Sequence, residues 1–160
     1  MWRLVGGCDS PCCSEQLKEE VATANIRIIF IAGPSGCGKT SFLKTLGNEN
    51  TVILPCHILL EQWIRHIIHG TDGQQFHSDM LKNCQNKILC IEDIDMSLCG
   101  RSASQIEMAK WIIEWAKQIK VVLTGIDIRE KCKFLLSHIE DDDSHSYGYY
   151  IFVPERSLPL

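Results

Sequence analysis

The stretch Gly33-Pro34-Ser35-Gly36-Cys37-Gly38-Lys39-Thr40 decides how this chain of 160 residues folds. It follows an apolar run, residues 26–32, which predicts a buried strand, and a helix-compatible stretch comes after it. The three glycines let the backbone curl until several N–H groups face one anion, and the next helix adds its positive end. In this context, the spacing G-x-x-x-x-G-K-T predicts a loop that binds phosphate.

Two side chains of this loop suit a nucleoside triphosphate and its metal ion. Lys39 is a point charge placed to reach the β- and γ-phosphates, and the Thr40 hydroxyl is a ligand for the Mg²⁺ that bridges them. The alternative, a glycine-rich turn with a chance Lys-Thr pair, would lack the strand and helix on either side. We expect the nucleotide to be bound by Gly33, Pro34, Ser35, Gly36, Cys37, Gly38, Lys39, Thr40 and Ser41.

The composition is that of an ordinary globular protein, with 45% hydrophobic and 22% charged residues. Its length suits one domain with a sizeable core. No run approaches the roughly 18 apolar residues of a membrane span, and the N-terminus lacks signal-peptide features. We therefore expect a cytoplasmic protein without membrane contact. Its net charge of −4 argues against a broad nucleic-acid surface, so any DNA contact should be local or supplied by a partner.

The nine cysteines are expected to be reduced thiols. Cys37 lies inside the phosphate loop and Cys90 inside a predicted buried strand, positions that do not suit a disulfide framework. Near the N-terminus, Cys8 and Cys12 have the spacing of zinc ligands. Because no matching Cys/His pair follows nearby, an irregular segment is the favoured interpretation.

Strand and helix patterns alternate along the chain. We expect a lead-in at residues 1–24 that is irregular apart from a short helix, one domain at 25–153 and a tail at 154–160. Helices are expected at 14–24, 39–46, 58–69, 77–84, 102–118 and 128–139, a loop at 96–101, and strands at 26–32, 51–54, 88–93, 121–125 and 147–153. This order favours a three-layer α/β/α fold around a five-stranded, mainly parallel sheet.

Apolar spacing also predicts which helix faces are buried. Trp111 and Trp115 should pack against the sheet rather than form an interaction surface. Positions with the spacing of one apolar helix face are Leu60, Ile64, Ile67 and Ile68 in the second long helix, and those expected to point inward from the last helix are Phe134, Leu135 and Ile139.

A second chemical element is the segment that runs from Ile88 to Asp93, I-L-C-I-E-D. A buried strand ending in two carboxylates holds them at the edge where parallel sheets bind ligands. One carboxylate can orient a metal ion, and the other can polarise an attacking water. We assign the Mg²⁺ role to Glu92, together with Thr40, and the base role to Asp93. An acidic loop after an ordinary buried strand, to which Asp95 would also belong, is the less favoured interpretation.

The strand at 121–125 ends in the hydroxyl of Thr124. If this strand lies between the other two, Thr124 would sit near the γ-phosphate and the attacking water and would have a catalytic role. A threonine that merely ends a strand explains this fragment equally well.

Together these segments resemble the AAA+ ATPase domain of the bacterial replication initiator DnaA and its relatives, the regulatory inactivator and helicase-loader proteins. The resemblance covers residues 25–153. It rests on G-P-S-G-C-G-K-T, on the stretch 51–68, on I-L-C-I-E-D-I-D followed by Gly100, Arg101 and Gln105, and on I-K-V-V-L-T-G. The resemblance implies that Glu92 and Asp93 are the Walker B acids and that Thr124 is sensor 1. It also implies that the P-loop (Walker A) contacts to the nucleotide are made by Gly33, Gly36, Gly38, Lys39 and Thr40.

Three departures from the family pattern bear on activity. Glu92 stands where the family usually has Asp, and its longer arm changes the metal geometry. Between Leu136 and Tyr147 the family carries a basic segment with its arginine finger, whereas this chain has Ser137, His138 and four acids. The chain also ends after the expected fifth strand, which leaves the helical lid and a DNA-binding domain unmatched. Because an arginine finger accelerates related triphosphatases by about three to five orders of magnitude, we expect slow turnover.

We therefore expect an AAA+ core that lacks the lid, binds ATP and Mg²⁺, and hydrolyses ATP slowly or with a partner's help. The resemblance implies a role in DNA replication initiation or its regulation, with replication proteins or further copies of the chain as partners. Two alternatives stay open, a nucleotide-dependent adaptor without turnover and a small P-loop kinase. Such kinases need a mobile lid rich in arginines, and the arginines of this chain are not clustered.

Overall fold

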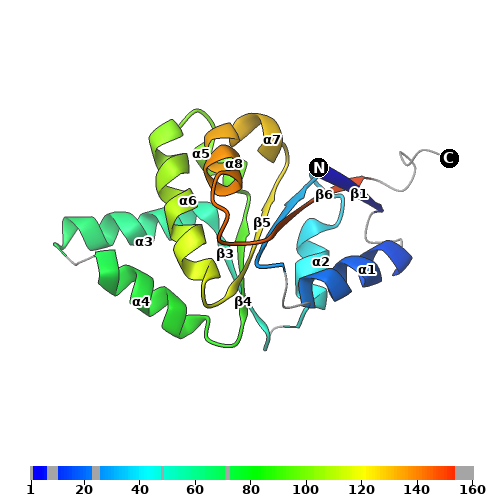
Figure 1. Cartoon of the computed structure of the whole chain (residues 1–160), viewed down its shortest axis with the longest axis horizontal. Coiled ribbons are helices and arrows are strands. Elements are labelled where there is room, and N and C mark those ends of the chain that lie inside the picture. Colours follow the sequence, from blue (N-terminus) through cyan, green and yellow to red (C-terminus); the bar gives the residue numbers. More distant parts are fainter. Residues whose placement is uncertain (1, 7–10, 23–25, 48, 71–72, 154–160) are drawn as a thin grey trace.

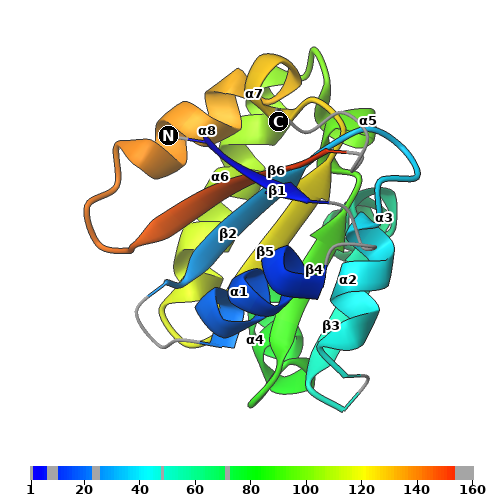
Figure 2. The same ribbon diagram turned by 90° about the vertical axis from the view of Figure 1, so that its right-hand side faces the viewer.

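The structure is a computed structural model that describes residues 2–6, 11–22, 26–47, 49–70 and 73–153. Figure 1 shows three layers, with a central sheet between two sets of helices. Helices α1 (Pro11–Ala22) and α2 (Lys39–Thr45) cover the face of the sheet that Figure 2 turns toward the viewer. On the opposite side lie α3 (Cys56–Ile68), α4 (Gly73–Asn83), α5 (Ile94–Leu98), α6 (Ser102–Ala116), α7 (Ile128–Lys131) and α8 (Lys133–Glu140). The predicted α/β/α arrangement is confirmed.

In the described part of the chain, the sheet has six strands in the order β1-β6-β2-β5-β4-β3, and each neighbouring pair is parallel. Strand β5 lies between β2 and β4. Because the strands run the same way, the carboxyl ends of β2, β4 and β5 meet at one edge of the sheet. The strands are β1 (Trp2–Gly6), β2 (Ile28–Ala32), β3 (Thr51–Pro55), β4 (Ile88–Glu92), β5 (Lys120–Gly125) and β6 (Tyr147–Val153).

Strand β1 corrects the prediction of five strands and an irregular N-terminal lead-in. Trp2–Gly6 forms a strand beside β6, with Arg3 opposite Tyr150. A run of five residues that ends in glycine gives little local strand signal, and its pairing partner lies at the far end of the chain. The zinc alternative at Cys8 and Cys12, and the tail at 154–160, fall outside what the structure describes.

The core has one part on each face of the sheet. All five residues of β2 are buried, as its continuous apolar sequence predicts. Ile28 and Phe30 pack with the cluster under α3–α8, and Ile29 and Ile31 pack with the cluster under α1 and α2. This division follows from the alternation of side chains along a strand. Trp115 is fully buried in the first cluster, so the prediction of a core role for it is confirmed.

The predicted apolar face of α3 is wrong in phase. Ile64, Ile67 and Ile68 are 51%, 58% and 72% exposed, whereas Leu59 is fully buried. The C-terminal half of α3 extends beyond the rest of its layer (Figure 1). Its contacts are with α4 and α6, since the ring of Trp63 packs against Phe76 of α4 and Trp111 of α6. None of the helices in the described part of the chain is both long and apolar enough to span a membrane.

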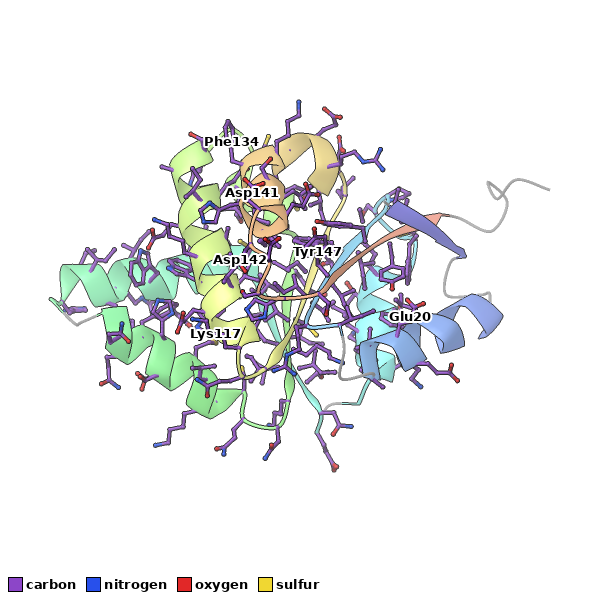
Figure 3. The ribbon with its side chains drawn as sticks, in the orientation of Figure 1. Glu20, Lys117, Phe134, Asp141, Asp142 and Tyr147 are labelled. Carbon is purple, nitrogen blue, oxygen red and sulfur yellow. The ribbon has the colours of Figure 1, made fainter. Side chains whose placement is uncertain are left out.

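Two other helical segments differ from the sequence prediction. The predicted loop at 96–101 instead begins within α5, and the predicted helix at 128–139 is divided into α7 and α8 at Cys132. Leu135 and Ile139 of α8 are buried as predicted, but Phe134 is 53% exposed (Figure 3). All three side chains lie in α8, where Phe134 and Leu135 are adjacent and therefore point about 100° apart around the helix, so the two need not both face the core.

Candidate phosphate-binding site

The loop between β2 and α2 has the tight backbone path that its glycines allow. Gly36 and Gly38 have φ angles of 80° and 100°, a region that other residues rarely adopt. Gly33 has no room for a side chain, because a Cβ atom there would lie 2.5 Å from the carbonyl oxygen of Phe152. Its N–H group donates a hydrogen bond to the carbonyl of Gly125 at 3.1 Å. The start of the loop is thereby fixed between the ends of β5 and β6.

Lys39 is only 8% exposed and folds over its own loop. Its Nζ donates hydrogen bonds to the carbonyl oxygens of Gly33 and Pro34, the latter at 3.1 Å, and lies 3.8 Å from the sulfur of Cys37. Both carbonyl acceptors are neutral, and a phosphate group would offer this ammonium a charged acceptor. The position of Lys39 therefore fits a phosphate contact.

Thr40 and Glu92 come from α2 and the end of β4, and their side chains meet. The Thr40 hydroxyl donates a hydrogen bond to Oε1 of Glu92 at 3.0 Å. Hydroxyl and carboxylate oxygens are hard ligands of the kind Mg²⁺ uses beside nucleotide phosphates. Glutamate, which replaces the aspartate of the family pattern here, thus still reaches the hydroxyl of the phosphate loop.

Asp93 forms the turn between β4 and α5 in a left-handed conformation, with φ 57° and ψ 46°. Its N–H group donates to Oγ1 of Thr124 at 3.4 Å. Thr124 is 2% exposed and belongs to the strand between β2 and β4. The structure therefore brings the two residues together, with Asp93 on the wall of the phosphate cleft and Thr124 behind it.

A cleft of about 350 Å³ opens beside the loop. Pro34 and Cys37 shape the loop instead of lining this cleft, since the Cys37 N–H donates to the Pro34 carbonyl at 3.2 Å and the Cys37 side chain is buried. Met96 and Ile126 line the cleft but were assigned no role from the sequence. Ile126 directly follows strand β5, whose end carries Thr124, and that position is its only sequence signal; Met96 lies within α5 and has none. The complete lining is Ser35, Gly36, Gly38, Lys39, Thr40, Ser41, Asp93, Met96 and Ile126.

A third acid, Asp95, lies buried next to this site. It is 2% exposed, and its Oδ2 accepts hydrogen bonds from the N–H groups of Ile126 and Asp127 at 3.0 Å and 2.7 Å. A solvated acidic loop would leave such a carboxylate in water. Asp95 is therefore not part of an acidic loop after the strand, which was the less favoured interpretation of this segment. Nothing in the sequence indicated that its carboxylate binds backbone amides.

Arginine does not line the cleft in the described part of the chain. The family pattern places a basic stretch in the segment after α8. This chain instead has Asp141 and Asp142 there, at the molecular surface (Figure 3). Ser144 donates side-chain and backbone hydrogen bonds to Asp142, and these hold the pKa of that carboxyl below its usual range. These acids are solvated surface groups.

Within the described residues, no group of three or more His, Cys, Asp or Glu side chains could hold a metal ion. A Mg²⁺ ion at Thr40 and Glu92 would therefore need further oxygens from phosphates and water. This is the way Mg²⁺ is usually bound with nucleotides.

Solved structures with the same arrangement include bacterial replication initiators. Domain III of DnaA from Thermotoga maritima matches with a TM-score of 0.68 at 20% identity, over 91% of this chain and 62% of that one. The chain has the fold of DnaA domain III. AMPPCP-bound DnaA from Aquifex aeolicus matches with a TM-score of 0.60 at 20% identity, over 87% of this chain and 44% of that one. The resemblance to the DnaA AAA+ domain is thus confirmed at the level of the fold.

Sequence similarity is more restricted than the shared DnaA fold. No protein-family profile matches the chain. It is 51% identical over 45 residues to the phosphate import ATP-binding protein PstB 3 of Streptococcus pneumoniae, and 26% identical over 136 residues to the disease resistance protein RPV1 of Vitis rotundifolia. These stretches are 28% and 84% of this chain, but only 16% and 9% of the two relatives. The chain therefore spans only a small part of the length of these two relatives.

Proposed function

We propose that this chain binds ATP with Mg²⁺ and hydrolyses it slowly or only with a partner's help. The observation that carries the proposal is the Thr40–Glu92 contact, which joins the phosphate loop to the acidic end of β4 beside a cleft of about 350 Å³. Lys39 would contact the β- and γ-phosphates, and Thr40 and Glu92 would hold the Mg²⁺. Asp93 polarises the attacking water. The ion supplies charge neutralisation for the phosphates.

The slow rate follows from the charges around the cleft. Its lining in the described chain contains Lys39 but no arginine. A positioned arginine is worth about three to five orders of magnitude in turnover in related triphosphatases. A partner or a second copy of the chain would have to supply that charge for fast hydrolysis.

The setting we propose is that of DnaA-like proteins, in replication initiation or its regulation. The shared fold supports this setting, in which other replication proteins or further copies of the chain would be the partners. The six cysteines with described side chains are free thiols, which fits the reducing conditions of the cytoplasm. The net charge of −4 supports a protein partner rather than extensive DNA contact.

A nucleotide-dependent adaptor without turnover is the second candidate. It is favoured by the same arginine-free cleft lining. The measurement that separates the two is phosphate release from Mg-ATP over a series of protein concentrations, with Asp93→Asn as the control. Turnover per molecule that rises with concentration and disappears in Asp93→Asn supports the ATPase. Release no greater than in the variant, with ATP still bound, supports the adaptor.

A further inference from the structure

Two buried polar side chains near the cleft bind backbone instead of facing the cleft. Asp95 and Gln105 are each 2% exposed. Asp95 lies in the first turn of α5, two residues after Asp93, and Gln105 lies in α6. Burying such groups is costly unless they are hydrogen-bonded, so their partners show what they hold in place.

Asp95 holds the segment that follows β5. One carboxylate oxygen, Oδ2, accepts the N–H groups of both Ile126 and Asp127. Ile126 lines the phosphate cleft, and Asp127 is the N-cap residue of α7. Together with the hydrogen bond from the Asp93 N–H to Thr124, these contacts join the turn at the end of β4 to the end of β5 at two points.

The space around Asp95 is fitted to this contact. A Cβ atom on Gly125 would lie 2.8 Å from Oδ1 of Asp95 and 2.7 Å from Cγ1 of Ile128. Glycine at this position therefore lets the backbone after β5 approach the carboxylate. Oδ1 itself has no hydrogen-bond partner, although it is buried. The aspartate thus uses a single oxygen to hold two amides.

Gln105 makes the next connection. Its Nε2 donates to the carbonyl oxygens of Leu98, at the end of α5, and Lys131, at the end of α7, at 2.8 Å and 3.0 Å. Its Oε1 accepts the N–H groups of Phe134 and Leu135 at the start of α8, at 3.0 Å and 3.3 Å. Both ends of α5 are therefore tied to the segment that contains α7 and the start of α8.

We propose that Asp95 is a positioning residue that couples occupancy of the phosphate cleft to α7 and α8. Asp93 and Asp95 lie on one turn, so a ligand that fixes Asp93 also fixes the carboxylate that holds Ile126 and Asp127. Gln105 extends the coupling to α8. This inference rests on the proposed nucleotide site, but it does not require that ATP be hydrolysed.

The test is hydrogen–deuterium exchange of the full chain with and without Mg-AMPPCP, a non-hydrolysed ATP analogue whose binding is titrated separately. Binding should slow amide exchange in residues 126–135 by about threefold or more, because a held loop opens less often. Asp95→Ala should still bind the analogue but lose this slowing. Asp95→Asn should retain it, because an amide oxygen can replace Oδ2 and its nitrogen can take the place of the unpartnered Oδ1. Asp79→Ala, at an exposed acid on α4, is the matched control and should behave as the unmodified chain.

The outcomes separate this inference from the proposed function. Failure of the unmodified chain to bind the analogue overturns the proposed function and this inference with it. Binding without slower exchange at 126–135, or an unchanged effect in Asp95→Ala, overturns the coupling alone. If Asp95→Ala does not fold, Gln105→Leu decides with Gln118→Leu as its exposed control. Slowing that still reaches Phe134 and Leu135 in Gln105→Leu contradicts the proposal.

Discussion

The hydroxyl of Thr40 and the carboxylate of Glu92 are joined by a 3.0 Å hydrogen bond, although 52 residues separate them in the chain. The first residue belongs to the glycine-rich loop and the second to the end of a buried strand. The two sequence patterns therefore converge on one place in the fold. Their oxygens are the pair that the proposed Mg²⁺ ion would share.

The Mg²⁺ contribution to ATP affinity should depend on Thr40 and Glu92 as a unit. Thr40→Ala and Glu92→Gln should each reduce the ratio of ATP affinity with Mg²⁺ to affinity with EDTA by about tenfold, as expected for loss of one charge-assisted contact. Because the two side chains touch, the double variant should lose little more than either single one. Titration of a fluorescent ATP analogue measures this, with Ser78→Ala, at an exposed position on α4, as control. Fully additive losses would show that the two residues act independently.

Gly33→Ala should destabilise the fold more than Gly36→Ala. At Gly33 the new Cβ would lie 2.5 Å from a backbone oxygen, whereas at Gly36 it would meet nothing within 4 Å and only the positive φ is unfavourable. We expect a loss of about 1–3 kcal/mol for the first variant and about 1 kcal/mol for the second. Urea denaturation measures both free energies of unfolding. Equal losses would contradict the close packing of the loop against β6.

Alkylation should distinguish the cysteines by burial. Among those with described side chains, Cys99 is exposed, while burial raises the pKa values of Cys56, Cys90 and Cys132 to about 12. Because the thiolate is the reactive form, Cys99 should react with iodoacetamide first and the other three only on unfolding. Mass spectrometry of timed digests follows each site. Early modification of Cys90 in the folded chain would contradict the burial of β4.

Acid should weaken the packing around His77. Its ring lies among Trp63, Phe76, Trp111 and Trp115, and burial lowers its pKa below the ordinary value of 6.5, although Glu114 and Glu107 oppose the shift. The folded state thus binds this proton less readily than the unfolded state. The stability that neutral His77 contributes is present above pH 6.5 and is lost as pH falls toward its folded pKa.

The comparison that isolates this effect is between His77→Phe and the control His57→Phe at an exposed position. The loss of urea stability between about pH 7.5 and pH 5 should be smaller in His77→Phe than in the unmodified chain, and unchanged in the control. An identical pH dependence in all three proteins would show that His77 is not responsible.

The phosphate loop and the acidic strand end could be predicted from the sequence because their signals are local. Glycines at fixed spacing and a continuous apolar strand each specify a backbone path without reference to distant residues. The place of Thr124 was conditional on its strand lying between the other two, and β5 does lie between β2 and β4. The same reasoning supplied the confirmed three-layer fold.

Features that depend on distant partners could not be predicted. Strand β1 pairs with β6 from the far end of the chain, and the exposure of Ile64 reflects a helix that extends past its layer. Asp95 looked like one more acid after a strand. Its function follows only from the amides of Ile126 and Asp127, 31 and 32 residues away.

The most direct test of the central claim is the affinity of the purified chain for Mg-ATP, measured by calorimetry for the unmodified protein, Lys39→Ala and Lys44→Ala. Lys44 lies exposed on the same helix and serves as the matched control. The account predicts that Lys39→Ala lowers the affinity by at least about tenfold, because a charged contact to phosphate is lost, and that Lys44→Ala leaves it unchanged. Equal affinity in all three proteins, or no binding by the unmodified chain, would contradict the assignment of this loop as a nucleotide site.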